Sequence, residues 1–234
     1  MATFKERIED LIGTEMDSNS ANGLGAIFDN SVRTTCKALP MQLIYEKGAL
    51  AAGLLDSDPT TLNATDKFIV HVERSDEGAV KRACTVADAA FFQDAKDANS
   101  IYEATTYTPV YSITNVGGIE TLEVHPVSSD AQPVNYYYID FASIESLDAA
   151  TTDSADDINL GLYASSLSGV PAIAYQAIVY KSASDYLMTY LNEAIQEDED
   201  TEITNLINNQ ISALKSSYME ELQRLGVELA TEVR

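Results

Sequence analysis

The most abundant side chains in this sequence that could act in catalysis or bind a metal are the carboxylates of Asp and Glu. Acids occur close together as Asp56 with Asp58, as Asp156 with Asp157, and in the run from Glu197 to Asp200. General acid–base catalysis needs two carboxylates held in a pocket that separates their pKa values, whereas these acids lie in polar stretches typical of loops. The segments DSDPT and DSADD would suit calcium, but the glycine and distal glutamate of a complete calcium loop are missing. We therefore predict solvated loops here, with neither a catalytic pair nor a metal site.

The histidines and cysteines are too few and too scattered to predict another kind of site. His71 and His125 each stand alone in a strand-like stretch, and Cys36 and Cys84 have no CxxC partner, so buried, reduced thiols are expected. The sequence has no GxGxxG, GxxxxGKS/T, HExxH or GxSxG motif, which are signatures of nucleotide, zinc and serine-hydrolase sites. We predict that the chain is not an enzyme and binds no cofactor.

The charge balance of the chain excludes one large class of partners. The sequence has 37 Asp and Glu against 14 Lys and Arg, for a net charge of −23, and 45% of its residues are hydrophobic. Binding to nucleic acid requires cations that replace the counterions of the phosphates, so specific DNA or RNA binding is not expected. No apolar run reaches the roughly 18 residues of a membrane span, and the N-terminus does not resemble a signal peptide. We expect synthesis in a cytoplasm and no membrane contact.

Hydrophobic periodicity near the N-terminus predicts helices. In FKERIEDLIG, residues 4–13, the apolar side chains fall at helical spacing and Gly13 is a plausible C-terminal stop. A second helix is predicted in LGAIFDNSVRTTCKALP, which Pro40 ends. The third, MQLIYEKGALAAGLL, is expected to continue to residue 55.

The middle of the chain changes to the alternating pattern of strands. The expected strands are KFIVHVERSD, AVKRACTV, TPVYSITNV, IETLEVHPV and PVNYYYIDFA. Gly117-Gly118 separates the third from the fourth and predicts a tight hairpin, because glycine tolerates positive φ. Asp88 is expected to cap a short helix in DAAFFQDAKDA. The result would be one small antiparallel sheet of four or five strands.

Two long amphipathic helices are predicted at the C-terminal end. Pro171 occupies a position favoured at a helix start, and the following segment AIAYQAIVYKSASDYLMTYLNEAI is rich in alanine and tyrosine. The acidic stretch QEDEDTE leads to a last helix, which Asp200 or Thr201 could cap, forming an αα-hairpin. The apolar stripe of the last helix steps by three and four residues through Ile203, Ile207, Ile211, Leu214, Tyr218, Leu222, Leu225 and Leu229.

The order of these elements predicts an α+β fold. Residues 1–65 and 151–234 would supply a helical layer or bundle, and residues 66–150 would form an inserted antiparallel β-domain. The last helix is longer than a small sheet needs for cover, so a neighbouring subunit could use the remainder.

The layout resembles the head–tail connector (adaptor) proteins of tailed bacteriophages. The resemblance rests on the opening FKERIEDLIG with the following helix ending in ALP, and on the hairpin TPVYSITNVGGIETLEVHP with PVNYYYIDF. It rests most on the closing pair of helices around the acidic turn in SGVPAIAYQAIVYKSASDYLMTYLNEAIQEDEDTEITNLINNQI. It is a similarity of pattern over most of the chain and contains no invariant motif.

The resemblance implies a virion structural protein rather than an enzyme. Such an adaptor forms a ring, usually of twelve subunits, between the portal protein and the downstream tail or neck protein, and genomic DNA passes through it unbound. The protein would be made in the host cytoplasm and reside in the virion neck. The C-terminal tail would dock onto the portal through Leu225, Leu229, Val233 and Arg234.

Two alternatives remain open from the sequence. One is another neck component, such as a tail-completion or stopper protein, although those are usually smaller and richer in strand. The other is an acidic calcium-dependent binding or enzymatic domain, which would require converging carboxylates in a deep pocket.

Overall fold

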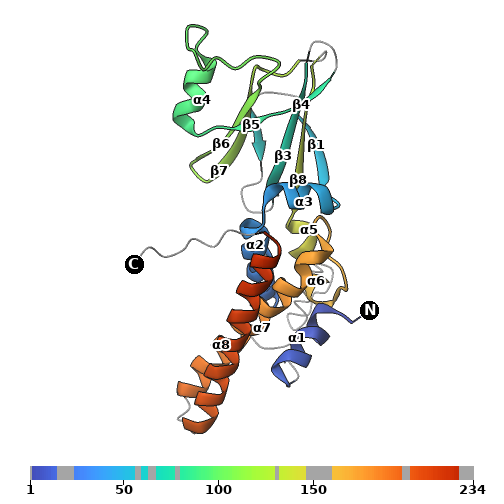
Figure 1. Ribbon diagram of the computed structural model, residues 1–234, viewed down its shortest axis with the longest axis vertical. Coiled ribbons are helices and arrows are strands. Elements are labelled where there is room, and N and C mark those ends of the chain that lie inside the picture. Colours follow the sequence, from blue (N-terminus) through green and yellow to red (C-terminus); the bar gives the residue numbers. More distant parts are fainter. Residues whose placement is uncertain are drawn as a thin grey trace. The chain divides into compact units, whose positions relative to one another are not determined.

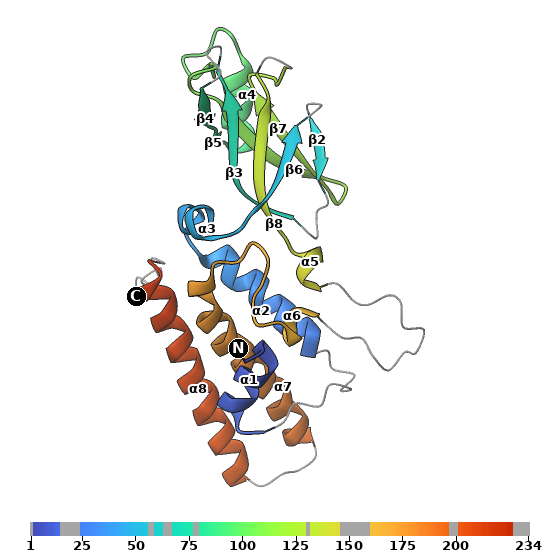
Figure 2. The ribbon, with the colours of Figure 1, turned by 90° about the vertical axis from the view of Figure 1, so that its right-hand side faces the viewer.

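The computed structural model describes residues 2–14, 24–55, 59–62, 67–76, 80–129, 132–145, 160–196 and 201–226. The chain forms two compact units, which are described separately below. The helical unit comprises Met1–Gly48 and Ala142–Arg234, and the β unit comprises Ala49–Phe141 (Figures 1 and 2). The α+β fold class expected from the sequence is confirmed.

The helical unit begins with α1, Phe4–Ile12, whose ends are set by local signals. Thr3 and Glu6 form a reciprocal capping box at its start, which satisfies backbone N–H groups that have no partner within the helix. Gly13 ends the helix with a φ of 75°, a conformation that glycine adopts without strain. This helix and its glycine stop are confirmed as predicted.

The remaining helices of this unit include the long pair α7 and α8. Their bounds are α2 Leu24–Ala38, α3 Met41–Lys47, α5 Ala142–Glu145, α6 Leu160–Tyr163, the 3-10 helix η1 Ala172–Ala174, α7 Tyr175–Gln196 and α8 Thr201–Arg224. α7 contacts α1, α2 and α8, and Figure 2 shows α8 (red) running alongside it. The predicted C-terminal αα-hairpin is therefore present, with η1 between Pro171 and α7.

The β unit contains two four-stranded sheets. The first has the order β1 Ala51–Leu55, β8 Val134–Asp140, β3 Lys67–Ser75 and β4 Lys81–Ala83. The second has the order β2 Thr60–Leu62, β7 Ile119–His125, β6 Val110–Val116 and β5 Thr85–Val86. Neighbouring strands are antiparallel except β5 and β6, which are parallel. Apolar side chains from both sheets share one core, for example Val72 and Leu122.

Two local predictions in the β unit are confirmed. Val116 pairs with Ile119 across Gly117 and Gly118, whose φ values are 64° and 86°, as a tight hairpin turn requires. Asp88 caps α4, Ala89–Lys96, by accepting a hydrogen bond from the backbone N–H of Phe91. α4 rests on β6 through a small core that includes Phe92 and Val110.

The start of the β unit and its number of sheets differ from the prediction. The third helix ends at Lys47 instead of residue 55, and AAGLL forms β1 because it pairs with β8 in the register Gly53↔Tyr136. The β unit therefore starts at Ala49 rather than at 66, and it ends at Phe141 rather than at 150. The single expected sheet is wrong, because the expected strand AVKRACTV divides into β4, which pairs with β3 in the first sheet, and β5, which pairs with β6 in the second. The second sheet also contains β2, which pairs with β7 far along the chain.

Candidate functional site: the α7–α8 hairpin

Small side chains let α7 occupy the middle of the helical unit. Ala177, Ser182, Ala183 and Ser184 are all buried on this helix. Helices approach one another more closely where the side chains between them are small. α7 can thus have neighbours on several sides, and it positions both α2 and α8.

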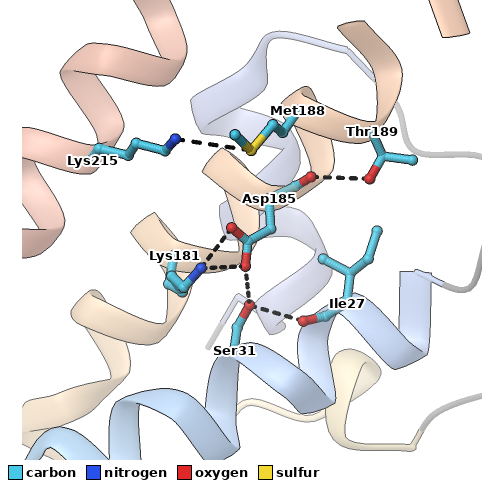
Figure 3. A network of polar contacts seen from close by, with 7 residues as sticks. All are labelled: Ile27, Ser31, Lys181, Asp185, Met188, Thr189 and Lys215. Atoms are coloured by element: carbon cyan, nitrogen blue, oxygen red, sulfur yellow. Dashed lines mark hydrogen bonds and ion pairs between the residues drawn. The ribbon is translucent and has the colours of Figure 1, made fainter. Parts of the chain in front are cut away.

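A polar network fixes α7 against α2 (Figure 3). The Lys181 ammonium donates to both carboxylate oxygens of Asp185, at 2.7 and 2.6 Å. The Ser31 hydroxyl donates to the carbonyl of Ile27 at 2.8 Å and lies 3.4 Å from Oδ2 of Asp185. Asp185 thus contacts Lys181 on its own helix and Ser31 on α2, in a partly buried place. This arrangement orients two helices, and we assign it a structural role.

α8 buries one face against α7. The buried residues are Ile207, Ile211, Leu214, Tyr218 and Leu222, which confirms the central part of the predicted stripe. At the edge of this face, Gln210 donates from Nε2 to the carbonyl of Leu11 at 2.9 Å. Lys215 lies with its Nζ 3.9 Å from the sulfur of Met188 (Figure 3). α8 is therefore anchored to both α7 and α1.

The hairpin also exposes apolar side chains. Leu206 on α8 is 68% exposed, and Ile203 and Met219 on the same helix are exposed as well. Met188 and Tyr190 are exposed on α7. Ile203 was expected in the buried stripe and is not buried. Leu206 and Met219 are apolar but lie outside the predicted stripe, because they do not fit its spacing. Exposed apolar side chains on helices are common at protein–protein interfaces.

The predicted portal-docking residues fall only partly within the described chain. Leu225 is half-buried in a turn after α8, and its N–H donates to the carbonyl of Glu221 at 3.0 Å. Leu229, Val233 and Arg234 lie outside the described residues, as does Asp200. α8 begins at Thr201, the other predicted cap.

The paired acids of the sequence also lie outside the described residues. This applies to Asp56 with Asp58, Asp156 with Asp157, and Glu197 to Asp200. Within the described ranges, no group of three or more His, Cys, Asp and Glu side chains could hold a metal ion. In the same ranges, no helix is long and apolar enough to cross a membrane.

His71 belongs to a polar cluster on the first sheet, although it has no neighbouring histidine or cysteine in the sequence. Its Nε2 lies 3.5 Å from Oε1 of Glu73. The other oxygen of Glu73 lies 3.3 Å from the Lys81 ammonium and accepts a hydrogen bond from the Tyr137 hydroxyl at 3.1 Å. The hydrogen bond to Glu73, followed by that to Tyr137, raises the pKa of Lys81. One carboxylate thus links side chains from β3, β4 and β8.

Both cysteines are buried and free, as predicted. Burial raises the pKa of Cys36 to about 12, and it raises the pKa of Cys84 to about 12 against an opposing effect of Arg74. Because the thiolate is the reactive form, neither side chain is placed to act as a nucleophile at neutral pH.

No protein-family model matches the sequence, and no curated protein sequence matches it. The function is therefore argued below from the residues and their geometry.

Proposed function

We propose that this chain is a head–tail adaptor of a tailed bacteriophage. It would be a virion structural protein, not an enzyme, that forms a ring below the portal and lines the DNA exit channel in the neck. The α+β layout supports this proposal, because a helical unit built from both ends of the chain carries an inserted β unit. This is the layout on which the resemblance to adaptor proteins rests.

The observation that carries the proposal is the uncovered apolar surface of the α7–α8 hairpin. α8 is a helix of 24 residues with one face on α7. It exposes Ile203 and Leu206 on one edge of that face, and Met219 on the other edge. An apolar surface of this kind is stabilised when a neighbouring protein removes it from water. In a ring, the hairpin of one subunit would contact the next subunit.

The acidic composition supports the same function. With a net charge of −23, the surface repels the phosphates of DNA instead of replacing their counterions. A channel lined by such subunits would let the genome pass without holding it. The portal above and a tail or neck protein below would be the other partners.

Sedimentation velocity tests this proposal with the purified protein, alone and mixed with the portal protein encoded in the same genome. We expect the portal to capture multiple copies of the chain as one fast-sedimenting complex, and we expect deletion of residues 225–234 to abolish capture. Absence of any joint complex across a range of mixing ratios would contradict the adaptor function.

A pair of matched variants tests the role of the hairpin in ring formation. Leu206→Asp places a charge on the exposed apolar surface, and Asn208→Asp adds the same charge at an exposed position two residues on, which faces another side of α8. We expect Leu206→Asp to reduce the number of copies captured, while Asn208→Asp retains the full complex. Equal behaviour of the two variants would remove the hairpin from the subunit contact.

A further inference from the structure

A second uncovered apolar surface lies in the β unit, at α4 and the loop after it (green in Figure 1). Ile101 is 90% exposed and Tyr102 is 54% exposed. The ring of Phe91, which is also exposed, lies with its centroid 5.7 Å from that of Tyr102. We call Phe91, Ile101 and Tyr102 the α4 surface.

The loop that presents Ile101 and Tyr102 is held by a dense set of hydrogen bonds. Asp97 accepts from the backbone N–H of Asn99 at its Oδ1 and from that of Ser100 at its carbonyl, both at 2.9 Å. The hydroxyl of Ser100 in turn accepts from the N–H of Tyr102 at 3.1 Å. The backbone that presents the exposed side chains is therefore held in place, which lowers the entropy lost when a partner binds.

The base of the α4 surface is anchored to the second sheet. Phe92, Ala95, Ala104 and Val110 form a buried cluster that joins α4, the loop and β6. The N–H of Ala104 donates to the carbonyl of Ala95 at 3.0 Å, which closes the loop onto the helix. The apolar side chains above this cluster are thus not needed for the core of the unit and remain available to another molecule.

The α4 surface has an acidic border. Asp88 and Asp94 lie three residues before and after Phe91, a spacing that places them on the same side of the helix. The exposed acids Asp97 and Glu103 flank Ile101 and Tyr102 along the loop.

The negative charge of these four carboxylates is not offset by ion pairs. None of the four forms an ion pair with a residue that the structure describes, although Asp88 caps α4 and Asp97 accepts hydrogen bonds within its loop. The basic residue of α4, Lys96, is paired with Glu123 and does not offset them.

We propose that the α4 surface docks another protein through a segment that carries apolar side chains flanked by lysine or arginine. Aromatic and aliphatic side chains in a fixed loop provide the apolar contact, and the acidic border favours cations around it. Two copies of this chain do not fit each other through the α4 surface, because each would bring its own acidic border against that of the other. This inference does not require ring formation or portal binding.

Selection from a ribosome-displayed random peptide library tests the chemistry of the partner. We expect peptides enriched on the wild-type chain to combine Leu, Phe or Trp with Lys or Arg. Chemically synthesised versions of these peptides should bind the wild-type chain with an affinity that falls as the salt concentration is raised. Ile101→Asp should weaken this binding by about tenfold or more, because it places a charge in the apolar contact.

Ile119→Asp is the matched control for this experiment. Ile119 is 54% exposed and pairs with Val116 at the opposite end of the β6–β7 hairpin from Val110, which contacts α4. We expect Ile119→Asp to retain the wild-type affinity, and circular dichroism should show both variants folded.

Three outcomes would overturn the inference. One is a selection without enrichment, and another is a set of enriched peptides that lack basic residues or bind Ile101→Asp as tightly as the wild type. The third is self-association in sedimentation that Ile101→Asp abolishes and Ile119→Asp does not, which would make a second copy the occupant.

Discussion

Among the described residues, Arg74 on β3 is the largest fully buried side chain, with 2% of its surface exposed. Its guanidinium is held mainly by backbone carbonyls. Nε donates to Pro126 at 2.9 Å, Nη2 donates to Val127 at 2.9 Å and to the side chain of Gln132 at 2.6 Å, and Nη1 donates to Ser75 at 3.2 Å. The planar fork of arginine suits several acceptors at once. Arg74 therefore fixes the segment between β7 and β8.

We predict that Arg74→Met lowers the free energy of unfolding of the β unit by about 3 kcal/mol, because it leaves buried carbonyls without a donor. Urea unfolding followed by circular dichroism measures this change. Lys37→Met removes an exposed cation from α2 and should alter stability by less than about 0.5 kcal/mol. A loss of similar size in both variants would contradict the role assigned to Arg74.

Cys36 predicts a pH dependence of stability. Burial raises its folded-state pKa from 9.0 to about 12, so the unfolded chain loses the thiol proton first as pH rises. The contribution of the Cys36 thiol to the free energy of unfolding is fully present below pH 9. It decreases between pH 9 and 12, with a limiting slope of about 1.4 kcal/mol per pH unit.

Cys36→Ala removes this titration. Relative to the variant, the wild type should therefore lose unfolding free energy as pH rises from 9 to 11, as measured by urea unfolding at each pH. A difference between the two proteins that stays constant over this range would disprove the buried titration.

At the scale of elements, the contact between β1 and β8 depends on a missing side chain. Gly53 pairs with Tyr136, and a Cβ at Gly53 would lie 2.3 Å from Cζ of the tyrosine ring. That ring also stacks on Tyr138, with centroids 5.6 Å apart. The ring of Tyr136 thus covers the backbone of β1 where glycine leaves room for it.

We predict that Gly53→Val lowers the free energy of unfolding by about 1 to 3 kcal/mol, because the valine displaces a packed ring. Ala52→Val enlarges an exposed neighbour on the same strand and should cost less than about 0.5 kcal/mol. In a Tyr136→Leu background the penalty of Gly53→Val should shrink, which a double-mutant cycle in urea would detect. Strict additivity would contradict this account.

At the scale of the whole molecule, the β unit is inserted through two adjacent strands. β1 and β8 pair with Ala51 opposite Tyr138, so the chain enters and leaves the unit at points about 5 Å apart. Insertions whose ends lie this close are tolerated because the host unit needs little rearrangement to close.

We predict that residues 1–48 joined to 142–234 by a short Gly-Ser linker remain helical and unfold cooperatively on heating. Circular dichroism would measure this, with excised residues 49–141 as the companion fragment. A helical fragment without a cooperative transition would show that the two units depend on each other for folding.

Elements with local signals could be predicted from the sequence. α1 carries its own cap and glycine stop, α4 carries its Asp88 cap, and the β6–β7 hairpin carries Gly117-Gly118. Each signal acts within a few residues. β1 and β2 were missed because their partners β8 and β7 lie far along the chain, and nothing within the segments themselves requires a strand.

The features of the candidate surfaces also fall into two groups, those that the sequence predicts and those that depend on tertiary packing. The sequence by itself determined the acidic character, the helical hairpin and the buried central stripe of α8, because composition and periodicity are properties of the chain. Only the tertiary structure decided that Ile101 and Leu206 are exposed while Arg74 is buried. Burial depends on which elements pack together, and that packing is set by contacts between residues distant in sequence.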